Sequence, residues 1–375
     1  MHARLWFIVA ALTATVPAAA QSPVALSPPP QPVVATPPDF PRGRISGYLF
    51  GDAYYNLVGN PNHGYLASGA DSLPANIDGA KVIGKDLNGV QIRRLYFQLD
   101  NDLSIRFATR FRLEMDSRSL TSDGKLGVNV KAAYMQARNV YPRADLLLGV
   151  LSTPIWEGSE EFWAYRSIEK TIGDFRGIGS SADVGLELKG FADSEHHLGY
   201  IVMLGNGPGQ KPEDNRYKKA YLSLPARFGD LRIEPYADYE GGFGSRDRAT
   251  YKLFAGYELK WLALGAEALD RVNHAASGVN QEPRGLSVFV RGAPTASFAA
   301  FARADFWEPD HRLKNRVDQQ LWIAGLDWQP ARDVHVMPNV EATQYVAKGT
   351  AVVPPHHDLQ ARVTFYYRFS RPQSP

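Results

Sequence analysis

The stretch LSIRFATRFRLEMD, residues 103–116, alternates between two unlike kinds of side chain. Its odd positions, from Leu103 to Met115, carry apolar residues and one threonine, whereas its even positions include three arginines and two acids. Successive side chains of a β-strand point to opposite faces. The stretch therefore predicts a strand with one apolar and one charged face, which suits either a water-soluble sheet or the wall of a pore.

Segments with this kind of alternation fill the chain after residue 43, and no helical pattern of comparable length competes with them. We predict sixteen strands, at 44–57, 90–100, 103–116, 127–140, 144–152, 182–192, 196–205, 216–226, 230–240, 248–259, 261–271, 284–293, 295–307, 319–329, 333–346 and 357–369.

The connections between these segments fall into two groups. Those after even-numbered segments are short, such as Asn101-Asp102, whereas most of those after odd-numbered segments are long, such as 58–89 and 153–181. Short turns at one rim and long loops at the other are typical of a transmembrane barrel with an even number of strands. The charged face of the strands is too polar to fill a dry core, and about sixteen strands enclose an aqueous channel.

We therefore expect an all-β protein, a transmembrane antiparallel β-barrel of about 16 strands over residues 44–369, with short periplasmic turns and long extracellular loops. It would lie in the bacterial outer membrane with its apolar face against lipid. Aromatic residues near strand ends would form girdles at the membrane interfaces. They are Tyr54, Tyr55, Trp261, Trp307, Trp322, Trp328, Tyr366, Tyr367 and Phe369.

The two ends of the chain have their own patterns. Residues 1–20 combine Arg4, an apolar run and a small-residue exit before Gln21, which is the layout of a cleaved signal peptide. Residues 21–43 are rich in proline and predict an extended periplasmic linker. Residues 370–375 follow the last predicted strand as a tail.

Composition and motifs exclude several functions. The chain has no cysteine, so thiolate metal sites and disulfides are excluded, and its formal net charge of +2 gives no indication of nucleic-acid binding. The adjacent histidines at 196–197 and 356–357 would point to opposite faces of a strand, which disfavours a shared metal site. We expect no enzymatic activity, no cofactor and no metal.

Three segments resemble the phosphate-selective porin O and P family of outer-membrane channels. They are ISGYLFGDAYYN at 45–56, VQIRRLYFQLDNDLSIRFATRFRLEMD at 90–116 and ADLLLGVLSTPIWEGSEEFWAYRSIEKTIGDFRGIGSSADVGLELKG at 144–190. The resemblance implies a homotrimer of sixteen-stranded channels that pass small anions such as phosphate. It also implies a basic lumen and a loop that folds inward at the constriction.

By this likeness, residues 153–181 form the constriction loop. Its candidate functional residues are Trp156, Trp163, Tyr165, Arg166, Lys170 and Arg176. The loop also carries several acids, including Glu157, Glu160 and Asp174. This mixed charge departs from a purely basic filter.

Seven arginines and two acids fall on the face that we expect to line the lumen. They are Arg94, Arg106, Arg110, Arg112, Arg303, Arg362 and Arg368, with Glu114 and Asp116. Rings of arginine attract anions into a pore. Alternatively, these arginines pair with neighbouring acids as an ordinary polar wall.

Three functions follow from these observations. The first is a passive diffusion channel for small hydrophilic solutes with a preference for anions. The second is a structural barrel that anchors a periplasmic partner through the proline-rich linker. The third is a barrel enzyme built on a lone serine and histidine at a rim.

Overall fold

The computed structural model describes residues 39–61, 84–120, 125–213, 215–244, 246–275 and 277–372. The predicted signal peptide and most of the predicted linker lie outside the described residues. No helix within the described ranges is long and apolar enough to cross a membrane.

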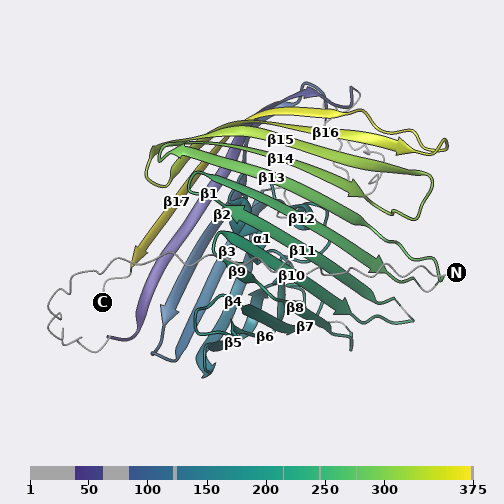
Figure 1. The fold of residues 1–375 in the computed structure, drawn as a ribbon. Helices are drawn as coiled ribbons and strands as arrows, with labels where there is room; N and C mark the ends of the chain where they lie inside the picture. Colours follow the sequence, from purple (N-terminus) through teal and green to yellow (C-terminus); the bar gives the residue numbers. More distant parts are fainter. Residues whose placement is uncertain are drawn as a thin grey trace, which may run out of the picture. The chain divides into compact units, whose positions relative to one another are not determined.

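Almost all strands that are consecutive in the chain pair antiparallel, and the last strand pairs with the first, so that the sheet closes into a barrel (Figure 1). The strands are β1 (Arg42–Val58), β2 (Asn88–Asp102), β3 (Phe107–Leu120), β4 (Leu126–Tyr141), β5 (Ala144–Ser152), β6 (Ala182–Phe191), β7 (Gly199–Gly205), β8 (Lys219–Ser223), β9 (Ala226–Phe228), β10 (Leu231–Glu240), β11 (Arg248–Glu258), β12 (Leu262–Asn273), β13 (Arg284–Thr295), β14 (Phe298–Glu308), β15 (Arg316–Ala331), β16 (Val334–Lys348) and β17 (Asp358–Pro372). The predicted all-β barrel is confirmed.

Strands β8 and β9 both pair with β10 and are two parts of a single wall strand, so the seventeen segments make the sixteen predicted wall strands. The break falls at Leu224-Pro225, inside the segment predicted as 216–226. Proline has no N–H to give to a ladder. The chain spans the break with a bond from the Leu224 N–H to the Pro235 carbonyl at 3.0 Å.

Strand β3 begins at Phe107 rather than at Leu103. The first four residues of the stretch 103–116 form the turn from β2, where the Ser104 hydroxyl accepts the backbone N–H groups of Arg106 and Phe107. Hydroxyl groups of serine commonly hold turns in this way. The alternation of residues 103–106 continues the strand pattern, but the local hydrogen bonds of Ser104 stabilise a turn there instead of a strand.

The outer surface is apolar on every side of the wall, and large hydrophobic side chains such as Phe111, Leu253 and Val340 are exposed there. A closed barrel with such a surface satisfies its backbone hydrogen bonds internally and can therefore span lipid. Among the predicted girdle residues, Trp261, Trp322 and Trp328 are exposed on the outside. By contrast, Trp307 is only 4% exposed and packs inside the barrel. Tyr366 also faces inward, where it lines a cavity.

Strand β17 extends to Pro372, which pairs with Arg44 of β1. Half of the predicted tail therefore belongs to the wall.

Candidate functional site

The loop 153–181 lies inside the barrel and carries two short helices, α1 (Glu157–Trp163) and α2 (Ile172–Phe175). Helix α1 packs against β11, β12 and β13, and Trp163 at its end is fully buried. Loop and wall share an apolar cluster of Phe162, Trp163, Tyr165, Ile168, Phe254, Ala263, Phe289, Phe301, Leu321, Ile323 and Met337. Burial of an aromatic or aliphatic side chain contributes about 1.5–3 kcal/mol, so this cluster fixes the loop firmly.

A second apolar cluster holds the two ends of the loop. Its members are Ile155, Trp156, Ile172 and Ile178 of the loop with Leu147, Leu151, Met203, Tyr221, Tyr236, Leu269 and Trp307 of the wall. The interior faces of β11–β16 are thus partly apolar, contrary to the uniformly polar second face that we expected. The signal was present in the sequence, because β13 carries apolar residues on both faces, as in Leu286, Val288 and Phe289.

Two glycines allow the loop to approach the wall closely. A Cβ on Gly256 of β11 would lie 2.7 Å from the ring of Phe162, and a Cβ on Gly158 of α1 would overlap the carboxylate of Glu234. Contacts this short do not occur between real side chains, so a side chain at either position would displace the Phe162 ring or the Glu234 carboxylate.

Cationic wall residues fasten the loop by donating to its backbone carbonyls. The donor and acceptor pairs are Arg93 with Ser167 and Ile168, Lys252 with Ile155, Arg271 with Ile178, Arg291 with Phe162, and Arg303 with Lys170. Buried carbonyls without a donor would be costly. These cations therefore have a structural function that their positions in the sequence do not reveal.

A β-bulge explains why Arg93 reaches the loop at all. The pairing of β1 with β2 shifts from Phe50–Arg94 to Gly51–Ile92, which leaves Arg93 as an extra residue. A bulge redirects the side chains around it, so that Arg93 and Arg94 both point inward. Strict alternation would have sent Arg93 to the lipid, and for this reason the sequence pattern missed it.

A second bulge, in β4, acts in the same way on Lys131. The pairing of β3 with β4 shifts from Arg112–Ala132 to Leu113–Val130 and leaves Lys131 extra. Its ammonium group lies 3.3 Å from the Glu114 carboxylate and 2.5 Å from the Ser181 hydroxyl at the end of the loop. The two bulges therefore add two cations to the interior that alternation does not predict.

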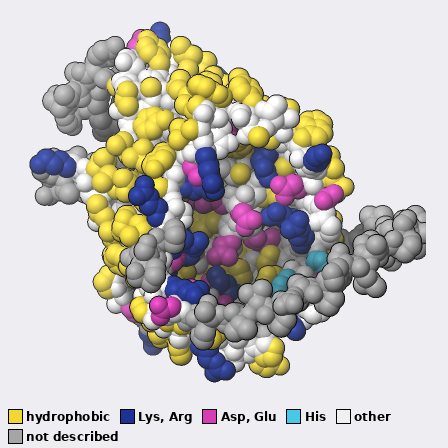
Figure 2. Space-filling view, turned by 90° about the vertical axis from the view of Figure 1, so that its left-hand side faces the viewer, with side chains coloured by type: hydrophobic (Ala, Val, Ile, Leu, Met, Phe, Trp, Pro, Cys, Tyr) yellow, Lys and Arg dark blue, Asp and Glu magenta, His cyan; other side chains and the backbone are white. Residues whose placement is uncertain are grey.

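A cavity of about 610 Å³ remains open between the loop and the wall. The wall side supplies Arg94, Arg112, Lys131 and Arg368, whereas the loop supplies Glu157, Glu160, Glu161, Asp174 and Arg166, with Asp327 from β15. Figure 2 shows the hollow at the end of the barrel where β17 terminates, with cationic and acidic side chains inside and apolar side chains outside. The cavity thus has a mainly basic wall and a mainly acidic loop.

The structure places the predicted lumen residues of the wall in different environments. Arg94 and Arg112 line the cavity, and Arg110 lines the adjoining space toward the short-turn rim. Arg94 pairs with Glu114 and Asp116, and Arg110 lies 2.6 Å from Asp100. These arginines lie inside the barrel, and most of their charge is balanced locally.

Three predicted lumen arginines do not line the open space inside the barrel. Arg106 lies in the exposed turn before β3, so its placement on the strand was wrong. Arg303 and Arg362 are only 3% and 6% exposed. Arg303 pairs with Asp305 beneath the loop, and the Arg362 guanidinium lies 2.6 Å from Glu341. Both were expected to line the pore but are covered instead.

The loop residues also divide into two groups. Trp156, Tyr165 and Arg166 line the cavity, and Arg166 pairs with Glu160 at 2.9 Å. Trp163 is buried in the apolar cluster. Lys170 lies 2.7 Å from Asp174, and the Arg176 guanidinium packs over the Phe175 ring at 4.6 Å. Burial lowers the pKa of Arg176 to about 10, which leaves it charged at neutral pH.

Burial also affects the acids of the loop. It raises the pKa values of Glu157 and Glu160 above the ordinary range, and Arg166 only partly opposes this effect at Glu160. Desolvation disfavours a charged carboxylate. The negative charges of Glu157 and Glu160 are therefore more easily neutralised by acid than that of a solvated carboxylate.

The spaces between this cavity and the short-turn rim form a vestibule that is predominantly basic. Its charged residues are Arg42, Arg44, Arg110, Arg112, Arg138, Arg332 and Arg368 with Asp100, Asp102 and Asp333. Seven arginines thus face three aspartates, and this region carries a net positive charge.

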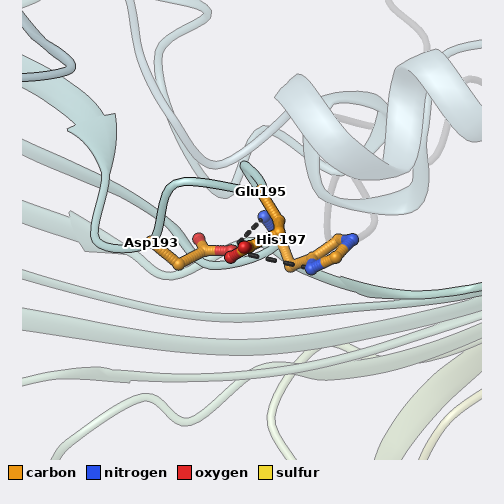
Figure 3. Close-up of side chains that lie close together, drawn as sticks. All are labelled: Asp193, Glu195 and His197. Atoms are coloured by element: carbon orange, nitrogen blue, oxygen red, sulfur yellow. Dashed lines mark hydrogen bonds and ion pairs between the residues drawn. The ribbon is translucent and has the colours of Figure 1, made fainter.

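The turn 192–198 brings together Asp193, Glu195 and His197, as Figure 3 shows. The Asp193 carboxylate accepts the backbone N–H groups of His197 and Leu198 at 2.9 and 2.7 Å. Against the desolvation of the carboxylate, these bonds hold the pKa of Asp193 below its usual value. The arrangement closes the turn at the rim.

No family model matches the sequence, and no curated protein sequence matches it either. Solved structures are similar in fold. The anion-selective porin from Comamonas acidovorans superposes with a TM-score of 0.62 at 11% identity, over 87% of this chain and 99% of that one. The outer-membrane protein OmpT of Vibrio cholerae gives a TM-score of 0.57 at 12% identity, over 89% of this chain and 100% of that one.

The outer-membrane channel DcaP of Acinetobacter baumannii gives a TM-score of 0.57 at 12% identity, over 87% of this chain and 97% of that one. At these identities the likeness is one of fold. The protein is therefore a closed, sixteen-stranded β-barrel of the outer membrane with the porin fold.

Proposed function

We propose that the protein is a passive diffusion channel for small hydrophilic solutes that prefers anions. The observation that carries this proposal is a pair of neighbouring spaces inside the barrel, the cavity beside the loop and the basic vestibule, which share lining residues. Fixed positive charge along a passage raises the local concentration of anions. Arg112 adds to this charge, because it has no carboxylate within ion-pair distance among the described residues.

The acidic side of the cavity limits the expected selectivity. Glu157, Glu160 and Asp174 of the loop face the same space as Arg94 and Arg112. Acids that line the cavity repel anions, most strongly those that carry several charges. We therefore infer a modest preference for anions, with phosphate as one of several candidate solutes rather than a selected one.

The test is the reversal potential of the purified protein in a planar bilayer under a KCl gradient. We expect stable single-channel currents and a potential of the sign that chloride selectivity gives. The absence of conductance would overturn the channel function, whereas a potential of the opposite sign would overturn only the preference for anions. Blocking of the chloride current by added phosphate measures how well that solute enters.

We further propose that the chain assembles as a homotrimer within the lipid. One structure of similar fold, OmpT of Vibrio cholerae, is described in a trimer form, and the resemblance to phosphate-selective porins implies the same state. Light scattering on the detergent-solubilised protein should give three times the mass of one chain. A protein that has the mass of one chain and still conducts would contradict the trimer and leave the channel function intact.

A further inference from the structure

A strip of aromatic rings lines the cavity on the side of β1, β2, β16 and β17. It consists of Tyr48, Tyr96, Tyr366 and His335, all of which line the cavity. The centroid of the Tyr48 ring lies 4.7 Å from that of Tyr96, edge to face, and 5.8 Å from that of Tyr366. The rings of Tyr366 and His335 are 5.3 Å apart. We call this set the aromatic strip.

Two guanidinium groups border the aromatic strip. Those of Arg94 and Arg112 lie 5.5 and 5.1 Å from the centroid of the Tyr96 ring. Arg94 is engaged with Glu114 and Asp116, whereas Arg112 donates its Nε–H to the Gln98 amide oxygen at 2.6 Å. Within the described part of the chain, the terminal N–H groups of Arg112 have no hydrogen-bond acceptor and can therefore donate to an anion.

The strip stands where two spaces meet. Tyr48, Tyr96, Arg112 and Arg368 line both the cavity beside the loop and the next space, of about 670 Å³, in the vestibule. A solute that moves between these spaces passes rings and guanidinium groups together. Tyr48 and Tyr366 are only half-buried, so that part of each ring faces the passage.

We propose that this junction is a binding subsite for small aromatic carboxylates, of the size of benzoate. The solute ring would pack on Tyr48 and Tyr366, since offset and edge-to-face contacts between rings are favourable. The carboxylate would accept paired hydrogen bonds from Arg112, whose planar guanidinium matches that geometry. The inference rests on the proposed channel function and names a preferred solute class for it.

The charges around the strip favour one negative charge over several. Glu157, Glu160 and Asp174 face the same cavity from the loop and repel each additional charge on a solute. A monoanion with an apolar ring meets this repulsion once and gains contact with the strip. Inorganic phosphate has no ring and carries more charge near neutral pH, so the same site disfavours it.

The experiment compares benzoate with cyclohexanecarboxylate, which has the same charge and nearly the same size but no aromatic ring. Each is added to the purified protein in a planar bilayer in KCl, and the block of the chloride current is titrated. We expect benzoate to reach half-block at a concentration at least about threefold lower than cyclohexanecarboxylate does. Inorganic phosphate serves as the comparison without a ring and should block more weakly than benzoate.

Variants assign the effect to the strip. Tyr48→Leu and Tyr366→Leu should abolish the difference between the two carboxylates, whereas Arg112→Gln should weaken block by both. Tyr134→Leu is the matched control, because Tyr134 also stands beside an arginine, Arg110 at 5.7 Å, but lines the vestibule and not the cavity. This variant should keep the difference between the carboxylates.

The failures of the two proposals are distinguishable. Equal block by both carboxylates in a conducting channel overturns the aromatic subsite and leaves the channel function standing. If no variant conducts, the channel function fails, and benzoate binding is then measured by calorimetry on the detergent-solubilised protein. Binding of benzoate that is lost in Tyr48→Leu would support the subsite, and no binding would overturn it.

Discussion

Arg93 and Arg94 are consecutive in β2, yet both guanidinium groups lie inside the barrel. Arg93 donates to the carbonyl of Ile168 at 2.9 Å, whereas Arg94 lies 3.4 Å from the carboxylate of Asp116. Because of the bulge, these two consecutive residues of β2 both face the interior, and each has a different function. One arginine holds the loop in place, and its neighbour lines the cavity in a pair with Glu114 and Asp116.

Replacement of these two arginines should therefore have different effects. Arg93→Met removes the donor of two loop carbonyls and the partner of Asp52, and each buried acceptor left without a donor costs about 1–3 kcal/mol. We expect larger and noisier single-channel currents as the loop loosens. Arg94→Met is the control and should change ion selectivity without added noise. Quiet, unchanged currents in Arg93→Met would contradict this function of Arg93.

Arg112 and Arg110 provide a second matched pair on β3. Arg110 is balanced by Asp100 at 2.6 Å, but Arg112 contacts the neutral Gln98. Arg112→Gln should lower the anion-to-cation permeability ratio by roughly two- to fivefold, the effect of one unit charge at contact distance in water. Arg110→Gln should lower it less, because Arg110 lies in the vestibule and not beside the cavity, and Arg44 at 3.3 Å still partly compensates the Asp100 carboxylate. Reversal potentials in a KCl gradient measure both ratios, and equal effects would contradict the special position of Arg112.

Selectivity should depend on pH through the loop. Burial raises the pKa values of Glu157 and Glu160, so these groups lose their negative charge at a higher pH than solvated carboxyls do. Acidification from about pH 7 toward pH 4, across the ordinary range of carboxyl groups, should increase the preference for anions. The Glu160→Gln variant should already have a raised anion-to-cation permeability ratio at pH 7, and this ratio should change less with pH than that of the parent protein. A preference for anions that falls with acid would refute this prediction.

The fit of the loop to the wall can be tested at Gly256. A Cβ there lies 2.7 Å from the Phe162 ring, so Gly256→Val must displace α1, and overpacking of this kind typically costs about 1–3 kcal/mol. We expect an increased conductance. Gly292→Val on β13 is the control, because the nearest atom to a Cβ there is 3.7 Å away. If both variants conduct like the parent protein, the loop tolerates displacement.

Alternation of side chains was sufficient to predict the barrel, because period-two patterning depends only on the two environments that the wall separates. It failed where the backbone departs from regular pairing. Arg93 and Lys131 are extra residues at bulges, and Pro225 interrupts a strand. An added residue leaves no trace in composition, so the faces after it cannot be assigned from the pattern alone.

The partners of the interior cations were also beyond the pattern. Arg303 looked like pore lining, but it donates to the carbonyl of Lys170, which lies 133 positions away in the chain. The apolar interior side chains of Phe289 and Phe301 pack against Trp163 and other loop residues, and side-chain alternation does not identify partners so distant in the chain. Only the folded loop distinguishes the arginines that face open space from those that hold the loop itself.

The seam between β1 and β17 has a consequence for biogenesis. The Thr364 hydroxyl donates to the Asp52 carboxylate at 2.7 Å across 312 positions of chain, and the same carboxylate pairs with Arg93, which fastens the loop. Contacts between such distant residues form late, because their loop-closure entropy must be overcome first. Closure of the seam and fastening of the loop therefore share one residue, Asp52. A nascent barrel that has not yet joined its ends lacks the Thr364 hydroxyl that holds the Asp52 carboxylate, and Arg93 gains this fully held partner only in the finished molecule.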